Sequence, residues 1–135
     1  QYEMAMSYMR LNDIKQARIE LQELIMLSPY SAIAPQVYYQ IASLYSLEGN
    51  LQEAIRNYDK VMSLYPGSPY SKEAMFEKAS ILEGAGNLRD ALTLYKKLEG
   101  VYPNQEALRI RLEGIQGRLK ERQVSYERER FRWKR

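Results

Sequence analysis

The side chains that most often carry enzymatic chemistry are missing from this sequence or stand without a partner. Its 135 residues include no cysteine and no histidine. This composition excludes disulfides, metal sites built from thiolates or imidazoles, and the usual nucleophile–base pairs. Carboxylates are present, but no pair of them has a spacing or an apolar setting that singles it out for acid–base catalysis. We therefore expect a protein that is not an enzyme, with no catalytic residue, no metal and no cofactor.

Residues suited to binding recur instead at a fixed step. Tyr2, Tyr39 and Phe76 are 37 residues apart, and a second set keeps the same step four residues later. Large rings give contact area at a low entropic cost, which suits the capture of a peptide or a helix. The sequence predicts an aromatic ladder flanked by mostly small or polar residues, made of Tyr2, Met6, Tyr39, Ser43, Phe76, Ser80 and Glu83. The alternative interpretation is that the rings pack between neighbouring helices.

The same step runs through the whole chain and predicts the elements that position the ladder. Three sets of identical residues are spaced by 37: Ala5, Ala42 and Ala79; Ala17, Ala54 and Ala91; Pro29, Pro66 and Pro103. A period of this length marks an array of repeats. Apolar residues at steps of three and four predict two helices per unit, separated by a turn such as Gly49-Asn50 and ended by the proline. The alanines are small enough for the two helices of a unit to cross closely.

These patterns predict an all-α fold, a right-handed α-solenoid of three helix pairs followed by a capping helix. The repeats span about residues 1–30, 31–67 and 68–104, and the capping helix spans 105–122. The capping helix has one apolar stripe, which would cover the last repeat while the opposite face stays in water. Its members are Leu108, Leu112, Ile115 and Leu119. The chain opens abruptly inside the first helix, so we expect a mature form or a piece of a longer protein.

The register of these residues resembles the tetratricopeptide repeat over roughly residues 1–119. In the second unit the resemblance rests on Tyr38, Ile41, Ala42, Tyr45, Ala54, Tyr58, Val61 and Pro66. It implies a non-catalytic scaffold that binds a peptide or helix of a partner protein on a concave face lined by the first helix of each unit. Some chaperone-binding members hold a carboxylate there with basic residues. The matching positions here are Tyr2, Met6, Gln40, Glu73 and Glu77, so that subclass is excluded.

The chain departs from the family pattern in two ways: its first unit lacks an aromatic residue at Leu21, and its period is longer, which bears on the setting. The period is 37 residues rather than about 34, and the extra residues follow the proline, in the segment from Tyr65 to Ala74. There Ser68 can cap a helix that starts at Pro69. This segment resembles repeats of bacterial cell-envelope proteins, such as the accessory protein of the Tol-Pal system and the lipoprotein of the outer-membrane assembly machine. The resemblance implies a periplasmic or outer-membrane-associated protein, with the cytoplasm as the alternative.

The excess of positive charge lies in the last 13 residues. Residues 1–122 carry 15 basic and 15 acidic side chains, whereas residues 123–135 carry five basic and two acidic ones. Because residues 1–122 are neutral, we expect no nucleic-acid partner. The basic aromatic tail is a candidate anchor on an anionic membrane surface, through Arg128, Arg130, Phe131, Arg132 and Trp133. It could equally continue the last helix and pack on a second copy, or fray.

Two further alternatives stay open at the level of sequence. The chain could be a self-assembly module that joins copies of itself through its ends or its tail. Within the groove, Glu73, Glu77 and Glu83 could recognise a cation, or form a solvated face with pairs such as Glu73–Lys78. We expect a protein or peptide partner and no small-molecule substrate.

Overall fold

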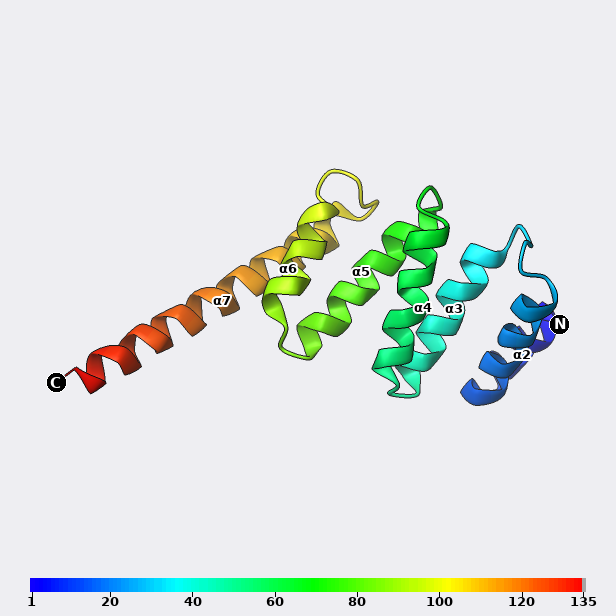
Figure 1. The fold of residues 1–135 in the computed structure, drawn as a ribbon, viewed down its shortest axis with the longest axis horizontal. Helices are drawn as coiled ribbons and strands as arrows, with labels where there is room; N and C mark the ends of the chain where they lie inside the picture. Colours follow the sequence, from blue (N-terminus) through cyan, green and yellow to red (C-terminus); the bar gives the residue numbers. More distant parts are fainter. Residues whose placement is uncertain (135) are drawn as a thin grey trace.

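The computed structural model describes residues 1–134 and consists of helices arranged one after another along its long axis (Figure 1). Within those residues there are seven α-helices and no strand, which confirms the all-α prediction. The helices are α1 (Tyr2–Arg10), α2 (Ile14–Leu27), α3 (Ala34–Leu47), α4 (Leu51–Leu64), α5 (Pro69–Gly84), α6 (Leu88–Lys97) and α7 (Gln105–Trp133).

Each helix packs against the next along the chain, so that α1–α2, α3–α4 and α5–α6 form three successive helical hairpins. In addition, α3 contacts α5 directly. The first helices of successive hairpins therefore lie on the inner side of the array. This arrangement is an α-solenoid, in which every unit buries its apolar face against its neighbours.

The turns inside the hairpins follow the predicted register. Asn12, Gly49 and Gly86 are 37 residues apart, and all three adopt a left-handed backbone with φ of 60°, 82° and 84°. Glycine adopts this conformation without steric cost, which is why it ends helices so often. The following residue then caps the next helix in two of the units: Asp13 accepts a hydrogen bond from the Gln16 amide at 3.2 Å, and Asn50 from the Glu53 amide at 3.3 Å.

The recurring alanines lie in the core clusters between the two helices of each unit. All six are fully buried, namely Ala5, Ala17, Ala42, Ala54, Ala79 and Ala91. Larger residues from both helices of each unit surround them, with Leu21, Tyr58 and Tyr95 among the most buried side chains. The predicted helix crossings are therefore part of the core.

Residues 123–133, which belong to the segment predicted as a basic tail or a continuation of the last helix, are helical. α7 runs through 29 residues without interruption, and residues 123–133 form its projecting end (Figure 1). The residue at the 37-step from Gly49 and Gly86 is Gln123, so the glycine that ends the first helix of earlier units is missing. Leu108 and Ile115 are buried against the last hairpin, as the stripe predicts. In residues 1–134 no helix combines the length and the hydropathy that a membrane span requires.

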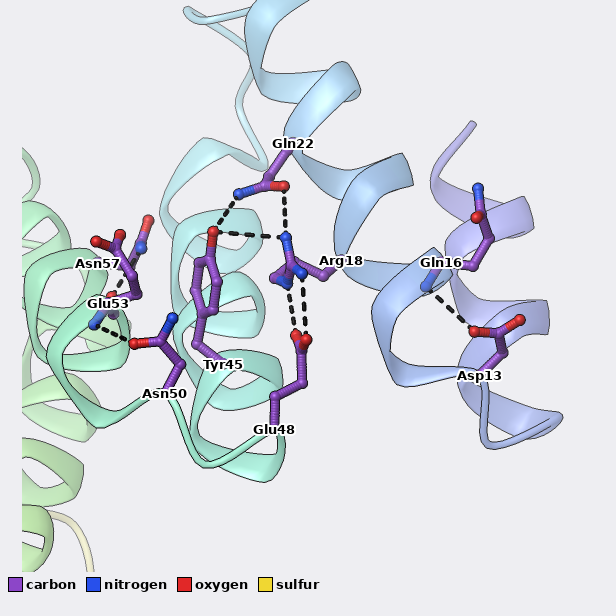
Figure 2. A network of polar contacts seen from close by, with 9 residues as sticks. All are labelled: Asp13, Gln16, Arg18, Gln22, Tyr45, Glu48, Asn50, Glu53 and Asn57. Carbon is purple, nitrogen blue, oxygen red and sulfur yellow. Dashed lines mark hydrogen bonds and ion pairs between the residues drawn. The ribbon is translucent and has the colours of Figure 1, made fainter.

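A polar cluster joins the first hairpin to the second (Figure 2). Arg18 of α2 forms two hydrogen bonds with the carboxylate of Glu48, at 2.5 and 3.1 Å, and its guanidinium lies 4.4 Å from the centre of the Tyr45 ring. Gln22 donates to the Tyr45 hydroxyl at 2.8 Å. The Arg18 and Glu48 side chains are only 14% and 25% exposed, so this pair is better shielded from water than an ordinary surface ion pair.

The positions that correspond to Arg18 and Tyr45 in the later units hold apolar residues. One and two steps of 37 lead from Arg18 to Ile55 and Leu92, and from Tyr45 to Leu82 and Leu119. The first junction between units thus uses charge and a cation–π contact where the later junctions have aliphatic side chains at the same register positions. The later junctions carry ion pairs at other register positions, Asp59–Lys78 between α4 and α5 and Glu83–Arg111 between α5 and α7. At the first junction, the contribution of the Arg18–Glu48 pair to stability should depend on pH.

We predict that acid weakens the first junction. The Arg18 guanidinium lowers the pKa of Glu48 in the folded protein below the ordinary value of a glutamate, 4.5. The stabilising contribution of Glu48 is therefore complete above that value and is lost as the pH falls through the lower folded pKa. Glu48→Gln should reduce the free energy of unfolding by about 1–2 kcal/mol at pH 7 and by much less near pH 3. Urea unfolding at the two pH values measures this.

The matched control is Glu99→Gln, which changes an exposed carboxylate at the end of the last hairpin. It should leave stability nearly unchanged at both pH values. Equal losses for Glu48→Gln at pH 7 and pH 3 would contradict the assigned role of the ion pair.

Candidate functional site

The inner face of the array is formed by α1, α3 and α5 and is continued by the first half of α7. Tyr2, the first residue of the predicted ladder, is half-buried on this face. Its hydroxyl accepts hydrogen bonds from the side-chain amides of Gln36 at 3.0 Å and Gln40 at 3.1 Å. Because both glutamines belong to α3, Tyr2 connects the first helices of two successive units.

Tyr39 makes the same kind of connection one unit further along. Its ring centre lies 5.6 Å from that of Tyr58 in α4 and 5.5 Å from that of Tyr70 in α5. Burial is the main reason why the pKa of its hydroxyl is raised, and the negative charge of Glu77 adds to the shift. The Tyr39 hydroxyl is therefore a neutral hydrogen-bonding group at physiological pH, and part of the ring remains open to the groove.

Phe76 does not provide an exposed rung of the ladder. It is only 9% exposed, because its ring stacks on Tyr102 at 4.6 Å with an angle of 6° between the planes. It also contacts the edge of Tyr95 at 5.4 Å. All three ladder residues thus contact the following unit or the segment that leads to it, and only Tyr2 and Tyr39 keep surface for a partner.

The predicted polar positions Ser43 and Ser80 lie half-buried beside a tyrosine of the same unit. The hydroxyl of Ser43 is 3.0 Å from that of Tyr58, and the hydroxyl of Ser80 is 3.0 Å from that of Tyr95. Burial raises the pKa of each of these tyrosines to about 12. The pairing follows the repeat, since 37 residues separate the two serines and 37 residues separate the two tyrosines.

In the first unit the same two positions hold apolar residues. Met6 occupies the serine position and Leu21 the tyrosine position. Leu21 is fully buried, whereas Met6 is half-buried on the inner face. Where methionine replaces the serine, leucine replaces the tyrosine. No buried tyrosine hydroxyl is therefore left without a hydrogen-bond partner.

The three predicted groove carboxylates have different surroundings. Glu73 accepts a hydrogen bond from the Tyr102 hydroxyl at 3.1 Å, while Lys78 pairs with Asp59 at 2.8 Å, so the expected Glu73–Lys78 pair does not form. Glu83 accepts a hydrogen bond from the Tyr95 hydroxyl at 3.1 Å. It also faces two arginines of α7, Arg111 at 3.5 Å and Arg118 at 3.7 Å.

Glu77 differs from both of these carboxylates because no hydrogen bond or ion pair to it is formed within residues 1–134, although it is half-buried. Burial raises the pKa of its carboxyl group, the neighbouring Glu73 raises it further, and Arg111 lowers it. Desolvation without a compensating bond makes the charged form costly. Glu77 is therefore the least satisfied charged group of the inner face.

The groove has an open hollow of about 440 Å³ where α5 meets α7. Its lining consists of Glu83, Ala107, Ile110, Arg111 and Gly114, and Ile110 is 57% exposed. The sequence-based prediction did not include Arg111, Arg118 or Ile110. They lie in the capping helix, where the 37-residue register no longer repeats residue types and hence gives no signal for a groove position.

The predicted anchor residues lie away from this groove, on the projecting end of α7 (Figure 1). The last hydrogen bond of α7 to the hairpins joins the Arg122 guanidinium to the Gly86 carbonyl at 3.2 Å. Beyond it the side chains are exposed, with Phe131 and Trp133 at 71% and 84%. These exposed residues are Arg128, Arg130, Phe131, Arg132 and Trp133.

The helical hairpins, their register and their shared inner face define an α-solenoid of the two-helix repeat class. Comparison with protein families supports this class: two tetratricopeptide-repeat models match, one over residues 34–104 and one over residues 1–25. The chain belongs to the tetratricopeptide repeat family. Repeats of this family mediate protein–protein interactions. Among curated proteins, none matches the chain significantly.

We predict that Tyr39 contributes to stability through its two ring contacts. Tyr39→Ala should lower the free energy of unfolding by about 2–4 kcal/mol, because it leaves a cavity between α3, α4 and α5. Tyr39→Phe keeps the ring and should change stability by less than about 1 kcal/mol. Urea denaturation of both variants measures the difference. If Tyr39→Ala unfolded at the same urea concentration as the wild type, the ring would contribute to the groove surface but not to stability.

Proposed function

We propose that this protein is a non-catalytic scaffold whose inner face holds a peptide or a helix of a partner protein. The proposal rests on the family and on one observation, the half-buried Glu77 carboxylate of α5, which has no hydrogen bond or ion pair within residues 1–134. The partially open rings of Tyr2 and Tyr39 lie on the same face, and the hollow beside Ile110 lies further along it.

The position of Glu77 indicates what a partner would contribute. A carboxylate that is partly removed from water and adjacent to Glu73 destabilises the fold at neutral pH, because its charged form is disfavoured there. A lysine or arginine of a bound peptide would add to the counter-charge that Arg111 supplies. A bound cation beside Tyr39 would also face an aromatic ring, which favours cations. The groove accordingly suits a partner segment with a basic residue next to an apolar one.

Glu77→Gln should make the isolated protein more stable and its groove a poorer binding site. Because the folded pKa of Glu77 is raised, its ionised form costs stability above that pKa, and the cost disappears as the pH falls through it. We expect a gain of up to about 1 kcal/mol at pH 7 and none near pH 3. For binding, peptides selected from a random library against the wild type should carry lysine or arginine and should bind Glu77→Gln at least about tenfold more weakly.

Glu99→Gln, outside the groove, is the control and should bind the selected peptides like the wild type. Selected peptides without basic residues, or with equal affinity for Glu77→Gln, would contradict the role of Glu77. Peptides whose binding sites map outside the inner face would contradict the scaffold proposal itself.

We further propose a bacterial cell envelope as the setting. The support is the 37-residue period together with the Tyr65–Ala74 segment, in which Ser68 accepts a hydrogen bond from the Tyr70 amide at 3.2 Å and Pro69 starts α5. This geometry accounts for the three extra residues, which form the start of a long first helix. Fractionation of the source cell should place the protein in the periplasm or with the outer membrane. Recovery in the cytoplasmic fraction alone would refute this setting.

A further inference from the structure

The stripe with which α7 covers the last hairpin does not end where the hairpin ends. Leu108, Leu112, Ile115 and Leu119 follow one another at alternating steps of four and three residues, and the same steps lead on to Arg122, Tyr126, Glu129 and Trp133. Residues at these steps share one face of a helix. Tyr126 and Trp133 are nevertheless 63% and 84% exposed, because no other helix of residues 1–134 extends that far.

The uncovered stretch is long enough to receive another helix. From Gln123 to Trp133 it comprises about three turns, roughly 16 Å at 1.5 Å per residue. A helical segment without tertiary packing is only marginally stable in water. A partner helix lying along this stripe would continue the contact that α6 makes with the first half of α7.

The end of α7 is basic overall, and its Tyr126–Trp133 face carries Arg122, Arg130 and Glu129. Residues 120–134 carry six basic and three acidic side chains, a net charge of +3. Arg122 and Arg130 flank Tyr126 at four residues on either side, so they lie on the same face. The ion pairs that α7 forms within residues 1–134 all involve its first half, the last of them at Arg118. The basic side chains beyond Arg118 form no ion pair within residues 1–134, and of these Arg122 donates a hydrogen bond to the Gly86 carbonyl.

We propose that residues 122–133 of α7 are a docking surface for an acidic amphipathic helix of a partner protein. A membrane surface fits less well, because Val124 and Phe131 lie on the opposite face from Tyr126 and Trp133, so the helix has no single apolar side to insert. A second copy fits less well, because pairing two such ends would bring their positive charges together. This surface is separate from the groove and does not depend on the function proposed for it.

Trp133 is the only tryptophan of the chain, so its fluorescence reports on this surface alone. The probe is a synthetic helical peptide of about four turns with leucines along one stripe and glutamates elsewhere. It contains no aromatic residue. Its matched control has lysine in place of every glutamate. The acidic peptide should shift the Trp133 emission to shorter wavelength and bind at least about tenfold more tightly than the lysine peptide, with an affinity that falls as salt rises.

Two variants separate the stripe from the opposite face of the same helix. Tyr126→Ser should weaken binding of the acidic peptide at least about fivefold, because it removes the ring beside Trp133. Phe131→Ser should leave the affinity within about twofold of wild type. Both side chains are exposed, and circular dichroism checks that the helical content of each variant is retained.

Several results would overturn the proposal. Equal binding of both peptides, equal losses in the two variants, or no emission shift at about 1 mM acidic peptide would each do so. A shift produced by vesicles of phosphatidylcholine and phosphatidylglycerol but not by the acidic peptide would assign the surface to a membrane. Growth of the light-scattering mass with protein concentration, together with a blue-shifted Trp133 and no effect of the peptide, would assign it to a second copy.

Discussion

The fold depends on the close approach of two helices at a pair of alanines in every unit. Because Ala42 and Ala54 are fully buried, as are their counterparts in the other units, larger side chains can interlock above and below each crossing. The spacing of these alanines along the chain fixes the position of the turn between the helices, and the turn in turn requires a residue that tolerates a left-handed backbone. Everything on the inner face is positioned by this repeated crossing.

The sequence was sufficient to predict features that every unit repeats. The helix pairs, the left-handed turns, the cap at Asn50 and the start of α5 at Pro69 all follow from local chemistry that recurs at 37 residues. It was insufficient where a residue's environment comes from elements outside its own unit. Nothing at the position of Phe76 indicates that Tyr102 will stack on it, and nothing at Glu83 indicates that arginines of α7 will face it.

Residues at equivalent positions of the repeat have different roles in the groove. Tyr2, Tyr39 and Phe76 share a register position, but their neighbours differ: two glutamine amides at Tyr2, and two rings each at Tyr39 and Phe76. Only Phe76 is buried, whereas Tyr2 and Tyr39 are half-buried. Contact between units therefore takes up most of the aromatic surface, and the groups left for recognition are charged. At the hollow between α5 and α7 they are already partly matched, since Glu83 faces Arg111 and Arg118. The Glu77 carboxylate, in contrast, has no hydrogen bond or ion pair within residues 1–134.

The inner face and the projecting end of α7 differ in charge and therefore imply different partners. On the inner face, the poorly satisfied group is a carboxylate surrounded by tyrosines, which favours a cation brought by a bound segment. On the projecting end of α7, basic side chains outnumber acidic ones around an exposed tyrosine and tryptophan, which favours an acidic segment. Because the groove lies along the hairpins and the basic stripe begins where their last contact ends, at Arg122, one ligand at each surface could be held at the same time. A scaffold with this geometry would bring a basic and an acidic partner segment together on one chain.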